Sequence, residues 1–253
     1  MTKFTAHPAG TFCWIELMAA EAAGARSFYT QLFGWAVNEI SMGDLGTYYI
    51  FTKDGADVAA MYERTAEMAD VPPFWMSYVS VDDVDASTEK AKSLGASVQS
   101  EPSDVGPMGR MAVLADPQGA AFAMWQAKEH PGVGVRDEAN TLCWNELQAR
   151  DIDAAKKFYP ALFPWTMKES PEYTEWHIGE RAIGGMMPAQ GPEHVPSFWM
   201  PYFAVADCDT IVANAQSLGA RVFMPPFDAA NVGRMAVLAD PQGAPFSVIK
   251  LFM

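Results

Sequence analysis

The sequence predicts an α+β fold made of two copies of one domain, each copy containing two βαβββ modules. The main observation is a repeat of twelve residues, because GRMAVLADPQGA at 109–120 recurs unchanged at 233–244. A second repeat opens each copy: the pattern T-x-C-W-x-E-L occupies 11–17 and again 141–147. Two long repeats indicate two homologous domains, since a solenoid needs several short ones.

Local patterns give the order of elements in the first copy. Residues 11–17 alternate and are rich in aromatic and branched side chains, which predicts a strand. A helix follows, capped by Glu21, apolar at helical spacing and ended by Gly34. Glycine-containing breaks then separate three expected hairpin strands. These strands span 35–40, 47–52 and 57–62.

The same order begins again within the copy. A strand at 74–81 and a helix at 82–94 precede three more strands, at 96–99, 110–115 and 121–126. Asp116-Pro117-Gln118-Gly119 has the residues of a tight turn, to which we assign Asp116 and its repeat Asp240. We therefore expect a first domain at 1–126, a linker at 127–140 and a second domain at 141–253. The second copy is six residues shorter, and we place the deletion in a hairpin loop.

Composition limits the partners. The 253 residues are half hydrophobic, enough for two cores. A net charge of −14 argues against nucleic acid and anionic membranes, which need a basic face. Without an apolar run of about 20 residues or a leader pattern, the expected location is cytoplasmic. Three cysteines predict reduced thiols. The expected assembly is a monomer with paired domains or a homodimer.

Several motifs in this order resemble the vicinal oxygen chelate superfamily of glyoxalase I, extradiol dioxygenases and bleomycin-binding proteins. Phe28-Tyr29 followed by Gly34 is similar to its FYxxxxG signature, which recurs at 158–164 with proline in place of glycine. The start of the second helix at 81–84 and the DPxGxxF stretches at 116–122 and 240–246 are also typical. The W-x-E-L openings resemble a two-domain glyoxalase-like group that includes a culture-filtrate antigen. The resemblance implies curved mixed sheets that form cups.

The resemblance also implies a divalent metal in each cup, held by His, Glu or Gln on the first, fourth, fifth and eighth strands. Alignment places other residue types at the first, fifth and eighth positions: Trp14, Met76 and Ala123, and in the second copy Trp144, Met200 and Ser247. The fourth-strand position falls near Met61, and near Met186 or Met187. None is a good ligand for a hard cation. We expect no metal and no other cofactor; a divalent metal on atypical ligands such as Glu16 and His177 is the alternative.

Glu16 and its repeat Glu146 are the candidate catalytic residues. Glu16 shares a strand face with Trp14, the face that the resemblance turns into the cup. A carboxylate there must be paired, hydrogen-bonded or protonated. One interpretation is a structural carboxylate held by Arg110, by Arg234 or by backbone donors. The other is a general base or a hydrogen-bond acceptor for a ligand.

Arg110 and Arg234 begin the seventh strand of each copy and are expected to reach over the cup mouth, toward an anionic ligand group or toward the glutamates. Tyr78 and Tyr202 share the strand face of the aligned methionines and are expected in the cup. Trp75 and Trp199 are expected in the core or at a domain interface.

The favoured hypothesis is a protein that binds a small, partly apolar or aromatic molecule without a metal. Its predicted ligand-binding residues are Trp14, Met76, Tyr78, Arg110, Trp144, Met200, Tyr202 and Arg234. The alternative is a lyase, isomerase or oxygenase of this superfamily, acting through an atypical metal site or through Glu16 and Glu146 as acid and base. A third possibility is that only one copy keeps a functional cup. The sequence contains no GxSxG nucleophile motif and no dinucleotide fingerprint.

Overall fold

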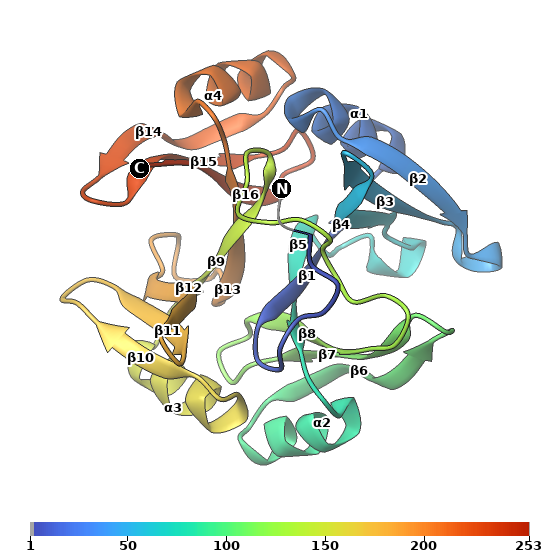
Figure 1. Ribbon diagram of the computed structural model, residues 1–253, viewed down its shortest axis with the longest axis vertical. Coiled ribbons are helices and arrows are strands. Elements are labelled where there is room, and N and C mark those ends of the chain that lie inside the picture. The colour runs from blue at the N-terminus through green and yellow to red at the C-terminus, as the bar shows by residue number, and fades with distance from the viewer. Residues whose placement is uncertain (1–2, 253) are drawn as a thin grey trace.

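The structure, a computed structural model, describes residues 3–252 and contains two domains of the same architecture (Figure 1). Domain 1 comprises β1 (Phe12–Ala19), α1 (Ala22–Phe33), β2 (Ala36–Ser41), β3 (Thr47–Lys53), β4 (Ala56–Glu63), β5 (Phe74–Ser80), α2 (Val84–Ser93), β6 (Ser97–Val105), β7 (Gly109–Ala115) and β8 (Ala121–Ala127). Domain 2 comprises β9 (Thr141–Ala149), α3 (Ile152–Leu162), β10 (Thr166–Glu169), β11 (Thr174–Ile178), β12 (Arg181–Pro188), β13 (Phe198–Ala204), α4 (Cys208–Ser217), β14 (Arg221–Ala229), β15 (Gly233–Ala239) and β16 (Pro245–Leu251).

Each domain forms one mixed sheet of eight strands. Sheet A has the order β2-β3-β4-β1-β5-β8-β7-β6, and sheet B has the matching order β10-β11-β12-β9-β13-β16-β15-β14. In sheet A, β1 is parallel to β4 and antiparallel to β5, which is parallel to β8. The two βαβββ modules of a domain are therefore joined along their first strands, and the predicted fold class is confirmed.

The residues that begin and end α1 are the ones that the sequence predicts. The Glu21 side chain accepts hydrogen bonds from the N–H groups of Ala23 and Gly24, and Gly34 ends α1 in the left-handed conformation with φ of 70°. The expected deletion lies mainly in one hairpin, because β10 and β11 have four and five residues where β2 and β3 have six and seven. β6 is longer than predicted and reaches Val105.

Each sheet has two different faces. In β1, Ile15 and Leu17 join the core beneath the helices, and Trp14 joins a separate cluster on the opposite face. We call these the helix face and the cup face; the cup faces of sheets A and B are cup A and cup B. A β-bulge leaves Cys13 unpaired between Phe12 and Trp14, and β9 has the same register shift. Cys13, Cys143 and Cys208 are buried, free thiols.

The two domains pack with their helix faces toward each other. One core combines α1 of domain 1 with β13, α4 and β16 of domain 2, and the other combines α2 with α3. Figure 1 shows α1 next to α4 and α2 next to α3. Trp75 packs against Phe203 with ring centroids 5.5 Å apart, and Phe12 packs against Trp199 at 5.0 Å. The expected place of the two tryptophans in the core and the domain interface is confirmed.

The repeated turns join the domains. Asp116 uses Oδ1 to accept hydrogen bonds from its own turn, at Gln118 N and Ala120 N, and this confirms the turn assignment. Its Oδ2 accepts a hydrogen bond of 3.0 Å from the Tyr159 hydroxyl of domain 2. Asp240 makes the reciprocal bond with Tyr29, also 3.0 Å. Each copy of the twelve-residue repeat therefore holds the first helix of the other domain.

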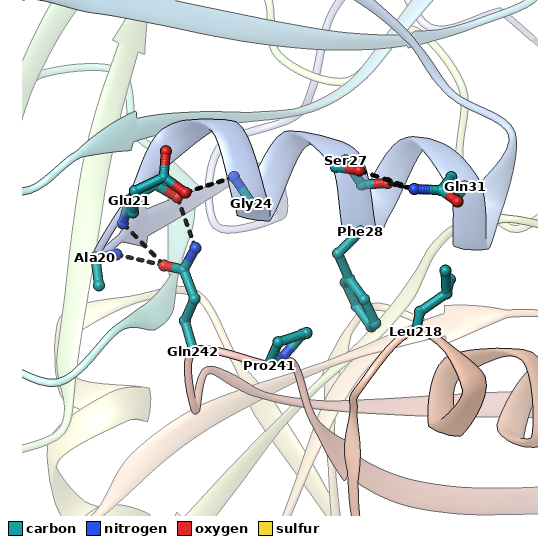
Figure 2. A pocket seen from close by; sticks show the side chains of 9 residues that line it. All are labelled: Ala20, Glu21, Gly24, Ser27, Phe28, Gln31, Leu218, Pro241 and Gln242. Atoms are coloured by element: carbon teal, nitrogen blue, oxygen red, sulfur yellow. Dashed lines mark hydrogen bonds between the residues drawn. The ribbon is translucent and has the colours of Figure 1, made fainter.

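A glutamine in each turn strengthens this contact. Gln242 Oε1 accepts from the Ala20 and Glu21 backbone N–H groups at 2.7 and 3.0 Å, and its Nε2 donates to the Glu21 carbonyl at 2.6 Å (Figure 2). Beside it lies a shallow groove of about 510 Å³, lined by Phe28 of α1 and by Leu218. The groove lies at the junction of the domains and outside both cups. No helix within residues 3–252 is long and apolar enough to cross a membrane.

Candidate functional site

The centre of cup A holds a buried carboxyl group. Glu16 lies in β1, opposite Met76 of β5 and Ala60 of β4, and its exposed fraction is 9%. The Tyr78 hydroxyl donates a hydrogen bond of 2.7 Å to Glu16 Oε2, and the Tyr48 hydroxyl is a second partner of the carboxyl. Trp14 Nε1 donates to Tyr48 at 3.3 Å. We call Trp14, Glu16, Tyr48 and Tyr78 cluster A.

Cup B repeats this arrangement with one more donor. Glu146 accepts hydrogen bonds from Tyr202 at 2.7 Å, from Tyr173 at 2.9 Å and from Gln148 Nε2 at 2.7 Å. Trp144 Nε1 donates to the Tyr173 hydroxyl at 2.8 Å. These five residues form cluster B. Glu146 is 4% exposed, so both glutamates are buried, and both carboxyl groups accept hydrogen bonds from side-chain donors.

Strand pairing explains how the clusters form. Tyr78 lies directly opposite Trp14, so its side chain stands on the same face and reaches Glu16, two residues further along β1. In cup B, Gly185 lies between β9 and Tyr173, and a Cβ atom there would be 2.1 Å from the Tyr173 hydroxyl. The glycine therefore allows the tyrosine to cross β12 and reach Glu146.

Burial sets the protonation behaviour of both clusters. It raises the pKa of Glu16 and of Glu146, and the hydrogen bonds from the tyrosines offset part of that rise. Burial, followed by the nearby carboxylate charge, raises the pKa of Tyr78 and Tyr202 well above that of free tyrosine. The hydroxyls therefore keep their protons at neutral pH and act as donors.

The expected positions of Arg110 and Arg234 are wrong. Met111 and Val113 belong to cup A, so strand alternation puts Arg110 on the helix face. There its guanidinium binds both carboxylate oxygens of Asp85 in α2, at 2.7 and 2.8 Å. Arg234 binds Asp209 of α4 in the same way, at 2.6 and 2.9 Å. Neither arginine covers a cup mouth or pairs with a glutamate.

Of the three methionines aligned near the fourth-strand position, only Met187 shares the strand face of Gly185. Met61 and Met186 lie in the cores under the helices. Ala60 and Gly185 are the residues that pair with Glu16 and Glu146 on the cup side. Ser247 lies in cup B, where its hydroxyl donates to Met200 Sδ at 2.9 Å.

Tyr48, Tyr173 and Gln148 are site residues that sequence reasoning missed. The two tyrosines are equivalent, but the shortened hairpin hides their correspondence. A signal was available, because each lies where the hairpin loop joins the next strand: Tyr48 is the second residue of β3, and Tyr173 immediately precedes β11. Gln148 could have been found from its spacing, since it follows Glu146 by two residues on the same strand face.

The donor set does not suit a hard divalent cation. Cup A presents Trp14, Ala60, Met76 and Ala123 near the strand positions where the resemblance implies metal ligands. Across residues 3–252, no group of three His, Cys, Asp or Glu side chains is placed to hold a metal ion. His177, named as an atypical ligand, lies in β11 with its Nε2 2.8 Å from Glu175 Oε2.

Comparison with known proteins matches both halves of the chain to glyoxalase-like families. Residues 11–124 match the family model of the glyoxalase/bleomycin resistance protein/dioxygenase superfamily, and residues 144–249 match that of a glyoxalase-like domain. CFP32 of Mycobacterium tuberculosis is 38% identical over 99% of this chain and 98% of its own length. The anthracycline biosynthesis protein DnrV of Streptomyces peucetius is 36% identical, over 99% of this chain and 96% of that protein.

Solved structures share the fold at low identity. A Mn(II)-bound glyoxalase from Novosphingobium aromaticivorans has a TM-score of 0.65 at 13% identity, covering 96% of this chain and 82% of that one. The 2,3-dioxygenase LapB from Pseudomonas sp. KL28 has a TM-score of 0.65 at 12% identity, covering 96% and 93%. The chain belongs to the glyoxalase/bleomycin resistance protein/dioxygenase superfamily, as a tandem pair of glyoxalase-like domains.

Proposed function

We propose that this protein binds a small, partly apolar or aromatic molecule in a cup, without a metal ion. The observation that carries the proposal is the pair of Glu–Tyr clusters. Each sets a buried carboxyl, two tyrosine hydroxyls and a tryptophan in the part of the cup where metalloenzymes of this superfamily place their ligands.

The chemistry of the cup walls supports a ligand of this class. Trp14, Met76 and Tyr78 in cup A, and Trp144, Met200 and Tyr202 in cup B, offer aromatic and thioether surfaces that pack against rings. The tyrosine hydroxyls and the carboxyl orient a ligand carbonyl or hydroxyl group. Two relatives are named for the biosynthesis of anthracyclines, which are aromatic compounds, and this also supports the proposal.

Tryptophan fluorescence tests the proposal, because Trp14 and Trp144 belong to the clusters. We expect quenching by at least one member of a panel of neutral aromatic ketones, phenols and quinones. Replacing the glutamate of the cup that holds the ligand, by Glu16→Gln or by Glu146→Gln, should weaken that binding. Arg234→Gln is the matched control and should leave it unchanged, because Arg234 faces α4. A panel in which no compound changes fluorescence or melting temperature would reject the proposal.

Metal independence is tested separately. We expect the purified protein to carry less than one tenth of an equivalent of Mn, Fe, Co, Ni, Cu or Zn by elemental analysis, and to bind its ligand equally well after treatment with a chelator. A stoichiometric metal would overturn this part of the proposal.

The second candidate function is acid–base catalysis on the bound molecule, as in a lyase or isomerase. It is favoured by the raised pKa of each buried carboxyl beside a tyrosine hydroxyl. Mass spectrometry of a bound compound after incubation would detect turnover. Under this candidate, the glutamine variants lose turnover without a fall in melting temperature; variants that unfold would favour a purely structural role for the glutamates.

A further inference from the structure

The two cups differ in ways that single out one of them. We propose that cup B is the ligand site, that its ligand is an amphiphilic molecule with a fused-ring or similarly flat apolar body and one hydrogen-bonding end, and that the linker closes cup A. This inference rests on the proposed function and specifies its site and ligand class.

The linker between β8 and β9 covers one end of cup A (Figure 1). The His130 ring stands perpendicular to Trp14 with centroids 4.6 Å apart, and its carbonyl accepts a hydrogen bond of 2.9 Å from Trp125 Nε1. Val133 is fully buried in the cup A cluster, and its N–H donates to the Cys13 carbonyl at 2.8 Å. Gly134 N–H then bonds Asp57 at the start of β4. The linker therefore crosses the sheet from β8 to β4.

This cover is fixed in place. The amino-terminal segment lies over it, where Phe4 N–H donates to the Gly134 carbonyl at 2.9 Å and His7 Nε2 lies 3.0 Å from the Val133 carbonyl. Gly132 has φ of 122°, and a Cβ atom there would lie 2.2 Å from the Cys13 carbonyl oxygen. A ligand would have to displace several backbone hydrogen bonds to reach Trp14, which is only 4% exposed.

The matching end of cup B is open and apolar. Trp144, the counterpart of Trp14, is partly exposed. On the outer strands, Met224 pairs with Val237 and Phe227 pairs with Met235, residues of cup B. Met224, Phe227 and Leu251 are 41%, 36% and 49% exposed. Large apolar side chains in contact with water, grouped on one face of a sheet, mark a binding surface.

Domain 1 provides the comparison that makes these residues informative. The positions of Met224, Phe227 and Leu251 are occupied in sheet A by the small residues Ser100, Ser103 and Ala127. The apolar strip is therefore a property of domain 2 and is not required by the fold.

Around its carboxyl, cup B is more polar than cup A. Gln148, Ser247 and Glu175 stand where sheet A has Met18, Ala123 and Ile50. Gln148 adds a donor to Glu146, and Glu175 pairs with His177. Cup B is therefore more polar than cup A around its carboxyl and more apolar toward β14.

This gradient defines the ligand. Tyr202 in β13 and Met235 in β15 are two strands apart, which corresponds to about 10 Å across a sheet. That distance fits a flat body of two or three fused rings. The hydrogen-bonding end of the ligand contacts cluster B, and its apolar body lies along Val237, Met235 and Phe227.

The test uses prodan, a neutral aminonaphthyl ketone whose emission moves to the blue and strengthens in apolar sites. We expect wild-type protein to bind it. A double variant, Met224→Ser with Phe227→Ser, gives domain 2 the serines of domain 1 and should weaken binding by about tenfold or more. Because both side chains are exposed, the melting temperature should stay unchanged.

A matched pair of variants locates the site. Met235→Ser in cup B should weaken prodan binding, whereas Met111→Ser, its counterpart in cup A, should leave the affinity within twofold of wild type. The reverse pattern would overturn the assignment to cup B while leaving the proposed function intact. Absence of prodan binding by the wild type would overturn the ligand class, and failure of the whole aromatic panel would reject the proposed function itself.

Sedimentation of the same variants tests another occupant of the apolar strip. We expect the double variant to keep the oligomeric state of the wild type. A shift from dimer to monomer with unchanged prodan affinity would show that the strip is a contact between copies of the chain, and would overturn the inference.

Discussion

Gly185→Ala is the most direct perturbation of cluster B. The added Cβ atom would lie 2.1 Å from the Tyr173 hydroxyl and 2.4 Å from Cζ of its ring, so the side chain must leave its position over β12. Tyr173 then loses its bond to Glu146, and Trp144 Nε1 loses its acceptor. We expect the protein to fold, because Gly185 does not have a positive φ angle that would exclude alanine.

The magnitude follows from two opposing effects. A hydrogen bond to a charged group contributes about 1.5–3 kcal/mol to stability. Replacing glycine by alanine in a compatible backbone restores roughly 0.5–1 kcal/mol, because the unfolded chain loses freedom. The net loss in the free energy of unfolding should be about 1–2 kcal/mol, which corresponds to roughly 2–8 °C in melting temperature for a chain of this size.

Urea unfolding in two backgrounds tests the reasoning. In the wild-type background, Gly185→Ala should destabilise the protein. In a Tyr173→Ala background the clash is absent, so the same substitution should stabilise it by roughly 0.5–1 kcal/mol. Equal destabilisation in both backgrounds would refute the role of Gly185 in positioning Tyr173.

Three further predictions concern the glutamates, the domain contacts and the misplaced arginines. Burial raises the pKa of Glu16 and Glu146 in the native state, so the free energy of unfolding falls as pH rises through the native pKa and these groups ionise. In urea unfolding, the free energy of unfolding of Glu146→Gln should therefore exceed that of wild type by more at pH 8 than at pH 5. An equal difference at the two pH values would contradict the raised pKa. Tyr29→Phe and Tyr159→Phe should each lower the free energy of unfolding in denaturant by about 2–3 kcal/mol. Each removes a buried hydrogen bond to an aspartate and the acceptor of a tryptophan N–H. Clearly different losses for the two variants would refute the reciprocal contact. In titration calorimetry, Arg234→Gln should bind the ligand with the same affinity as wild type. A tenfold loss of affinity would show that Arg234 is part of the binding site.

The fold could be predicted from the sequence because strand alternation, helix caps and turn residues are local patterns, and they occur in both copies. Strand alternation in β1 placed Trp14 and Glu16 on one face, and the turn residues identified Asp116. The prediction for Arg110 was wrong because neighbouring residues of a strand face opposite sides of the sheet. Met111 lies on the cup face of β7, so Arg110 lies on the helix face. The ion pair with Asp85 joins a strand to a helix 25 residues earlier, and no local pattern specifies such a contact.

The rest of the candidate site depends on long-range placement. Tyr48 reaches Glu16 across β4, and this requires the registers of two strand pairs. The linker was predicted only as a connection, yet His130 packs on Trp14 because the chain turns back over sheet A after β8. A sequence pattern does not specify where an irregular segment lies, so the difference between the two cups emerges only from the structure.

The crossed contacts of the repeated turns affect how the chain folds. Neither domain contains a complete core, because α1 packs on β13 and β16 and α3 packs on residues of β7 and β8. During synthesis, α1 therefore packs first on β1, β3 and β4 of its own domain, and its partners in β16 follow only after more than two hundred further residues have been added. The molecule should unfold in one cooperative transition, and separating the halves at the linker should yield two fragments that become fully structured only when mixed.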